Sequence, residues 1–514
     1  MVSTRRDVLR WGIASAVGSA LLGGTAAAPG GFDQLRRHVD GQLVMPQDRE
    51  YARARRSQMR EHDHLHPAAV LYAAGVEDVR RAVLFAQDRG IELSVRSGGH
   101  HLEGWSTGDG LVLDLSRVNR ATAVTGPNSV AVGPATTSLE SLEALDPHGL
   151  ALPSGICATV CPGGFVTGGG VGLMMPHSGL GADHLRAAEV VLADGRVVTA
   201  SADSEPDLHW ALRGGGAANF GVVTRLSLRA DPLGRVTNYL MAWPFEAADR
   251  VGAAWQHWQA AQPEALGSAL MLLHADELPG AVPLVVAMGL WTGSPDSLRP
   301  RLDELAELAE QPPLVDLDWS ASYREAMLQW WALDTTLPAR PITEDLLRPA
   351  ALLSDVAKAV QRRPALRTIQ GRFFDRPMPP EGIDAWINAF ASDRRPGQSR
   401  LSMALRTGGA AGRPSRTSTA YPHRDASFHL DFSAQQNGWA DLPADKEAAD
   451  AWSARGLRAI TPHSTGEAYM NFPEPHLPHY ADAYWAENLD RLSGVKRAYD
   501  PHHLFRPPQG VPAR

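Results

Sequence analysis

Three glycine-rich segments, RSGGHH, CATVCPGGFVTGGGVG and GGGAANFGVV, lie between residues 96 and 223. Clustered glycines let main-chain amides approach a ligand closely, because no Cβ stands in the way. One such cluster alone would be a weak signal, since glycine-rich turns are common in proteins. Three clusters in one stretch of chain indicate a single long ligand that is contacted at several points.

The spacing of these glycines argues against the commonest nucleotide-binding patterns. A dinucleotide fold needs a strand, then G-x-G-x-x-G, then a helix and an acidic residue about 20 positions further on. Gly168, Gly170 and Gly172 follow no clear strand. The sequence also contains no Gly-Lys-Ser or Gly-Lys-Thr, the pattern of phosphate loops that bind nucleoside triphosphates. Neither a nicotinamide cofactor nor triphosphate hydrolysis is indicated.

Composition narrows the class of partner. The chain has 514 residues, which is room for two domains, and 44% of them are hydrophobic, which is enough to build a large core. The formal net charge is −8, and no basic stripe with interleaved aromatic residues is present, so nucleic acid is not an expected partner. A soluble protein that acts on a small molecule fits this composition better.

The first 28 residues have the pattern of a signal peptide. Arg5 and Arg6 precede the apolar run WGIASAVGSALL and the small residues GTAAAPGG. Adjacent arginines are typical of the twin-arginine machinery, which exports folded proteins and so permits cofactor loading before export. The apolar run is too short for a stable membrane anchor. We expect a cleaved signal peptide over 1–28 and a periplasmic or secreted protein, with an uncleaved tether as the alternative.

The rest of the chain divides near residue 235. Before that point, helices and strands alternate around the glycine-rich loops: the apolar spacing predicts a helix over 76–89 that ends at Gly90, and Asp194-Gly195 predicts a hairpin turn. Residues 236–459 hold most of the tryptophans and read as a second domain, and 460–514 form a closing segment.

The chain has two cysteines, Cys157 and Cys161. In an exported protein they could form a disulfide, although such a short loop would remove little entropy from the unfolded chain. A metal site would need further ligands at suitable spacing, and the sequence shows none. From the residues alone, the role of the pair stays open.

The chain contains the motifs RSGGHHLEGWS, PSGICATVCPGG, TGGGVG with SGLGADHL, GGGAANFGVVT, and the C-terminal YMNF and KRAYDPHHLF. In order and spacing, these motifs resemble those of the berberine-bridge-enzyme-like flavin oxidases of the vanillyl-alcohol-oxidase group. The resemblance covers residues 50–510 and is loose through 236–459. It implies an α+β fold with a two-subdomain, PCMH-type FAD-binding domain at 29–235, completed by 460–514. It further implies that 236–459 form an inserted substrate domain, an antiparallel sheet backed by helices.

The resemblance implies that FAD is bound covalently through His100 and that Cys157 forms a second covalent bond to it. Cys161 stands where the family usually has glycine, so competition by Cys161 for the bond, or its pairing with Cys157, stays open. Phe165 stands where histidine is common in the family, so a pocket wall that differs there stays open as well. Gly98 and Gly99 would lie along the pyrophosphate. The further residues that the resemblance assigns to cofactor binding are Arg96, Ser97, His101, Gly155, Thr159, Val160, Gly163, Gly164, Gly168, Gly169, Val222 and Val223.

The resemblance also assigns the chemistry of the site. Tyr469 would take the hydroxyl proton of a small-molecule substrate as a hydride leaves its carbon for FAD, and Asn471 would orient the reacting groups. A tyrosine has an ordinary pKa of about 10, so this role requires neighbours that lower the pKa, and the sequence does not identify them.

The implied activity is the oxidation of an alcohol, a sugar hydroxyl or a natural product, with O2 as the electron acceptor and hydrogen peroxide as a product. The alternatives are a dehydrogenase that uses another acceptor and a flavin- or ligand-binding protein without turnover.

Overall fold

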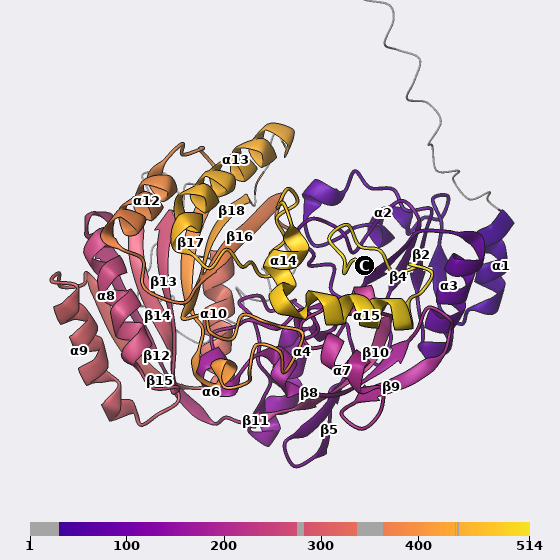
Figure 1. The fold of residues 1–514 in the computed structure, drawn as a ribbon, viewed down its shortest axis with the longest axis horizontal. Helices are drawn as coiled ribbons and strands as arrows, with labels where there is room; N and C mark the ends of the chain where they lie inside the picture. The colour runs from indigo at the N-terminus through magenta and orange to yellow at the C-terminus, as the bar shows by residue number, and fades with distance from the viewer. Residues whose placement is uncertain (1–29, 275–281, 337–362, 437, 439–441) are drawn as a thin grey trace, which may run out of the picture.

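The computed structural model describes most of the chain after the predicted signal peptide (Figure 1). The predicted signal peptide at 1–28 lies outside the described residues. Among the helices that the structure describes, none combines the length and the apolar character needed to cross a membrane. The described residues are 30–274, 282–336, 363–436, 438 and 442–514.

The first sheet has the strand order β1-β2-β4-β3, with β2, β3 and β4 parallel and β1 antiparallel at one edge. Helix α3 packs against this sheet through Val79, Val83 and Ala86, which are fully buried, and ends at Gly90 in the left-handed conformation, with φ at 62°. The predicted helix and its glycine stop are therefore confirmed. The elements are α1 (Gly30–His38), β1 (Gln42–Val44), α2 (Tyr51–Ala54), β2 (Ala69–Tyr72), α3 (Val76–Arg89), β3 (Leu93–Arg96) and β4 (Leu111–Asp114).

The second sheet is antiparallel, with the strand order β5-β6-β10-β8-β9. The predicted hairpin at Asp194-Gly195 joins β8 to β9, and Gly195 takes a positive φ of 81°, which a tight turn needs. The elements are β5 (Ala123–Gly126), β6 (Ser129–Val132), α4 (Ser138–Leu145), β7 (Leu150–Ala151), α5 (Pro162–Phe165), α6 (Met175–Ser178), β8 (Leu185–Val191), β9 (Val197–Ser201), α7 (Pro206–Ala211), β10 (Val222–Arg229) and β11 (Asp231–Pro232), which pairs with β7.

A seven-stranded antiparallel sheet follows, in the order β15-β12-β14-β13-β17-β18-β16 within the described residues. The strand β12 is buried on both faces: Leu240 packs in one hydrophobic cluster and Met241 in another. Helices α8, α9, α12 and α13 cover one face, and α10 lies on the opposite face (Figure 1). The elements are β12 (Arg235–Pro244), α8 (Ala248–Ala261), β13 (Leu266–His274), β14 (Leu284–Trp291), α9 (Arg299–Leu308), β15 (Val315–Ser322), α10 (Tyr323–Thr336), β16 (Leu366–Phe374), α12 (Pro380–Ala391), β17 (Ser399–Arg406), β18 (Phe428–Gln436) and α13 (Leu442–Ile460).

The C-terminal segment returns to the second sheet with helices α14 (Tyr480–Trp485) and α15 (Leu489–Tyr499), drawn in yellow in Figure 1. A buried ion pair fixes its end. Lys496 Nζ lies 2.6 Å from the Asp500 carboxylate and donates to the carbonyl oxygen of Asn219 at 2.7 Å. Asp500 in turn accepts the backbone N–H of Leu504 and of Phe505, both at 2.9 Å. The pair therefore ties the last residues to the third glycine-rich segment.

Replacing Lys496 by methionine should destabilise the protein, because it leaves the Asp500 carboxylate buried without its cation. We expect a loss of about 3–5 kcal/mol in the free energy of unfolding, measured by urea denaturation. Arg196→Met is the matched control, since the Arg196–Asp194 pair is more than half exposed on both sides, and it should leave the denaturation midpoint unchanged. Equal effects of the two substitutions would show that burial of the Lys496 pair contributes nothing.

Candidate functional site

A cavity of about 380 Å³, here called the central cavity, lies where the glycine-rich segments, the seven-stranded sheet and the C-terminal segment meet. The second domain contributes side chains of β16, β17 and β18, and the C-terminal segment contributes the YMNF motif. The predicted site residues that line the central cavity are Ser97, Gly98, Gly99, His100, His101, Gly155, Cys157, Thr159, Val160, Gly163, Gly164, Val223, Tyr469 and Asn471.

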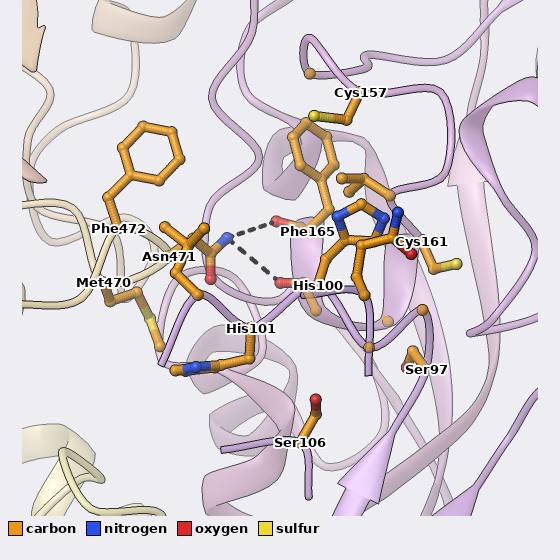
Figure 2. Close-up of a pocket in the computed structure, with 18 of the residues that line it drawn as sticks. Ser97, His100, His101, Ser106, Cys157, Cys161, Phe165, Met470, Asn471 and Phe472 are labelled. Carbon is orange, nitrogen blue, oxygen red and sulfur yellow. Dashed lines mark hydrogen bonds between the residues drawn. The ribbon is translucent and has the colours of Figure 1, made fainter. Parts of the chain in front are cut away.

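His100 stands on the loop that follows β3. Its Nε2 lies 2.8 Å from Thr159 Oγ1, so the first and second glycine-rich segments meet at this imidazole. Gly99 has a φ of 70°, which favours glycine, and its carbonyl oxygen accepts the Gln58 backbone N–H at 3.1 Å. Figure 2 shows the ring in the middle of the cavity wall, below Cys157. The loop thus holds the His100 imidazole at the cavity wall in a fixed position.

The two cysteines have different surroundings, and neither is in a disulfide. Cys157 is half-buried and lines the same cavity as His100 (Figure 2). Cys161 is buried, and its thiol donates to the carbonyl oxygens of Ala135 and Thr159 at 3.3 and 3.5 Å. Burial raises the pKa of the Cys161 thiol to about 12. Cys161 is therefore held as a protonated packing residue, and the pairing with Cys157 that the sequence left open is absent.

Tyr469 lies under the second glycine cluster. Its phenolic oxygen accepts the backbone N–H groups of Gly170 and Val171 at 3.0 and 3.2 Å and Asn471 Nδ2 at 2.9 Å. Gly170 has a φ of 82°, and a Cβ there would lie 2.7 Å from the backbone of Gly181, so only glycine can bring this amide to the phenol. The orienting role predicted for Asn471 thus has a geometric basis, and Asn471 Nδ2 also lies 3.5 Å from the Gly164 and Phe165 carbonyl oxygens (Figure 2).

The expected lowering of the Tyr469 pKa is not what the site produces. Burial raises the pKa above its usual value, although the three N–H donors oppose this by favouring the phenolate. The side chain is only 3% exposed, and the donors are neutral amides rather than cations. The desolvation of the ring oxygen therefore outweighs the hydrogen bonds.

Four of the predicted cofactor-binding residues do not line the cavity. Arg96 is buried in an ion pair with Asp114 at 2.7 Å and donates to the Ala54 carbonyl oxygen, so it anchors the end of β3. Val222 packs in the core between the first two sheets. The remaining two, Gly168 and Gly169, make room for neighbouring side chains, because a Cβ would meet Asn471 at the first and Tyr421 or Tyr469 at the second.

The second domain contributes polar residues that the sequence did not identify. On β18, polar side chains alternate with the buried apolar residues of the opposite face, so they point toward the cavity side of the sheet. The alternation FHLDFSAQQ was the one available signal, since a fully buried strand normally has no polar face. The cavity-lining polar residues of this domain are Arg367, His429 and Gln435.

Asp431 lies between His429 and Gln435 on the same face of β18, with its Oδ2 3.8 Å from His429 Nδ1. Burial raises the pKa of Asp431 to about 8, and burial lowers the pKa of His429 to about 3. Within the described part of the chain, Asp431 Oδ2 and both His429 ring nitrogens have no hydrogen-bond partner. Near neutral pH the pair is uncharged, with one proton on the carboxyl group and a neutral imidazole.

Comparisons with known proteins show which families and proteins this chain is similar to. Residues 67–201 match a family described as FAD binding domain, and residues 468–512 match a family described as berberine and berberine like. An uncharacterized FAD-linked oxidoreductase of Bacillus subtilis is 27% identical over 479 residues, which cover 92% of this chain and 97% of that protein. A xylooligosaccharide oxidase of Thermothelomyces thermophilus is 28% identical over 463 residues, 87% of each chain.

Solved structures agree. The glucooligosaccharide oxidase of Acremonium strictum, described with a 6-S-cysteinyl, 8α-N1-histidyl FAD, matches with a TM-score of 0.79 and 23% identity, over 94% of this chain and 99% of that one. The fold is the predicted α+β, PCMH-type FAD-binding fold, and the protein is an FAD-linked oxidoreductase. In its C-terminal family match and among its relatives, the chain is similar to berberine bridge enzyme-like proteins.

The cavity residues fit an FAD. His101 packs its ring on Trp105 at 4.7 Å between centroids, and burial lowers the pKa of His101 to about 3, so the imidazole is neutral. His101 Nδ1 and Ser106 Oγ line the cavity, are buried, and have no hydrogen-bond partner among the described residues. Buried polar atoms normally have partners, so a polar ligand along this wall would satisfy them. Of the chain's own groups, His100 and Cys157 are placed to hold it.

The state of Cys161 can be tested by alkylation. We expect Cys161 to resist iodoacetamide in the folded protein, because its thiol is buried and protonated, and to take up the label after unfolding without any reductant. Peptide mapping by mass spectrometry measures both outcomes. A Cys161 peptide that is labelled only after reduction would show that the residue forms a disulfide.

Proposed function

We propose that the protein is an exported FAD-dependent oxidase. It takes a hydride from the carbon that carries a hydroxyl group in a sugar, another alcohol or a natural product, and it passes the electrons to O2 with release of hydrogen peroxide. One observation carries this proposal: His100, Cys157 and the hydrogen-bonded phenol of Tyr469 line a single cavity. The oligosaccharide oxidases among the relatives support a sugar hydroxyl as the first substrate class to test.

FAD supplies the hydride acceptor when it is bound. The chain would hold it through His100 on the loop after β3 and through Cys157 on the loop before α5, the same residue types as in the histidyl and cysteinyl linkages of the Acremonium enzyme. Both side chains extend from loops whose backbones are hydrogen-bonded to neighbouring segments, which fixes their positions. Export rests on the twin-arginine pattern in residues 1–28.

Tyr469 is the proposed base. Its oxygen already accepts three N–H groups, so the phenolate has its hydrogen bonds in place and the phenol proton must point elsewhere. A substrate hydroxyl in the central cavity would meet an oxygen whose ionised form is favoured by three N–H donors and opposed by burial. Asp431 is the competing candidate, because its pKa of about 8 is close to the range in which a general base works best.

The covalent cofactor is the first test. Purified protein is denatured in acid, and the intact chain is weighed by mass spectrometry. We expect a flavin adduct on the wild-type chain, no adduct on the His100→Ala, Cys157→Ser double variant, and oxygen consumption with peroxide release for at least one member of a sugar and alcohol panel. Flavin reduction without oxygen consumption would instead indicate a dehydrogenase, and no bound or reconstitutable flavin would overturn the proposal.

Replacing Tyr469 by phenylalanine should lower the rate of flavin reduction by substrate by about 10²–10⁴-fold, the usual contribution of a positioned base. The flavin should stay attached, since Tyr469 does not bond to it. Stopped-flow absorbance measures the rate, and Asp431→Asn, which keeps the size of the side chain, should cost less than about tenfold. If Asp431→Asn instead causes the large decrease in the reduction rate and Tyr469→Phe the small one, Asp431 is the base.

The pH dependence separates the same two groups. A base acts in its deprotonated form, so the reduction rate should rise with pH. Because burial raises the pKa of Tyr469 above its ordinary value of about 10, the rate should still be rising at pH ~10 if Tyr469 is the base. A rate that levels off just above pH 8 would instead follow the ionisation of Asp431, whose pKa is about 8.

A further inference from the structure

One contact between the two domains involves Cys157, the residue predicted to form the second covalent bond to FAD. Arg367 is the second residue of β16, at the edge of the seven-stranded sheet, and its Nη1 donates to Cys157 Sγ at 3.4 Å. Cys157 belongs to the second glycine-rich segment, on the FAD-binding side of the cavity. Both residues line the cavity, so the second domain brings a permanent cation to this thiol.

Residues 57–63 hold Arg367 in place. The backbone N–H groups of Arg60 and Glu61 donate to the carbonyl oxygens of Pro364 and Ala365 at 3.0 and 2.9 Å. The Glu61 carboxylate then accepts the backbone N–H of Arg367 at 3.0 Å. This segment lies against the residues just before β16 and fixes the main chain of Arg367.

The same segment is anchored at a second point. The Arg363 guanidinium forms an ion pair with the Asp63 carboxylate and donates to the carbonyl oxygen of Ser57 at 2.7 Å. Gln58 N–H donates to Gly99, next to His100. One short segment thus positions both the histidine loop and the arginine that contacts Cys157.

A guanidinium beside a thiol favours the thiolate, which is the form of cysteine that acts as a nucleophile. The Cys161 thiol, four positions further on, instead faces two carbonyl oxygens among the described residues. We propose that Arg367 stabilises the thiolate of Cys157 and so directs the second covalent bond to FAD to this cysteine. This inference rests on the proposed covalent FAD.

The bond balances with O2 as the oxidant. An electron pair of the Cys157 sulfur forms the bond to carbon 6 of the flavin ring, the position that the Acremonium enzyme uses. The thiol proton and the proton from that carbon both leave. The two electrons left on the ring pass to O2, which takes up two protons and becomes hydrogen peroxide.

The test uses a His100→Ala background, in which Cys157 alone can retain flavin covalently. The full-length protein is denatured and digested, and the fraction of Cys157 peptide that carries flavin is measured by mass spectrometry. We expect Arg367→Gln to lower that fraction by about tenfold or more, because the thiolate loses its cation, and Arg367→Lys to restore most of it. Arg363→Gln is the matched control, since it weakens the same interface without contacting Cys157, and it should keep the linkage.

Three results would overturn the inference. Full Cys157 linkage in Arg367→Gln would show that the cation is not needed, and its loss in Arg363→Gln as well would show that docking of residues 57–63 matters instead. Flavin on Cys161 in the wild-type chain would show that Cys161, and not Cys157, forms the second covalent bond. With His100 intact, the histidyl adduct reports on folding and on the proposed function: if it is present while Cys157 is unmodified in the wild type, only this inference fails.

Discussion

Residues 57–63 are hydrogen-bonded to the start of β16, and these bonds help to hold the two sides of the central cavity together. Those bonds join the edge of the seven-stranded sheet to the loops of the FAD-binding side, so each domain closes the cavity that the other begins. The shifted pKa values of Asp431 and His429 follow from burial, since desolvation is the largest cause of both. The His429 ring belongs to the second domain, and Tyr469 and Phe472 of the C-terminal segment pack against it.

Local patterns were enough to predict much of the fold. The helix at 76–89 needed only its apolar spacing and Gly90, and the hairpin at Asp194-Gly195 needed only two turn residues between apolar runs. The same holds for the loop at 96–101, where glycines and histidines stand side by side in the sequence and together line the cavity. In each case the residues that determine the structure are within a few positions of one another.

The second domain's part of the site could not be predicted this way. Arg367 contacts a cysteine 210 positions away, and nothing in the strand sequence LRTIQGRFF distinguishes a cavity arginine from a surface one. The prediction of cofactor-binding residues from the glycine clusters was limited for a related reason. Gly168 and Gly169 were assigned to the cofactor, whereas they leave space for Asn471 and Tyr469, because a cluster signals close approach without indicating what approaches.

Within this wall each polar group keeps the charge state that its partners allow. Burial works against any charge in the cavity, and it acts alike on the Tyr469 phenol, the Asp431 carboxyl and the His101 imidazole, so all three are neutral near pH 7. A group can ionise there only with a partner that favours the charged form: three amide donors for the phenol, the guanidinium of Arg367 for the Cys157 thiol. Cys161 has neither, which is why two thiols in one loop can differ in reactivity. Desolvation therefore makes the placement of a few donors, rather than the type of side chain, decide which residues react.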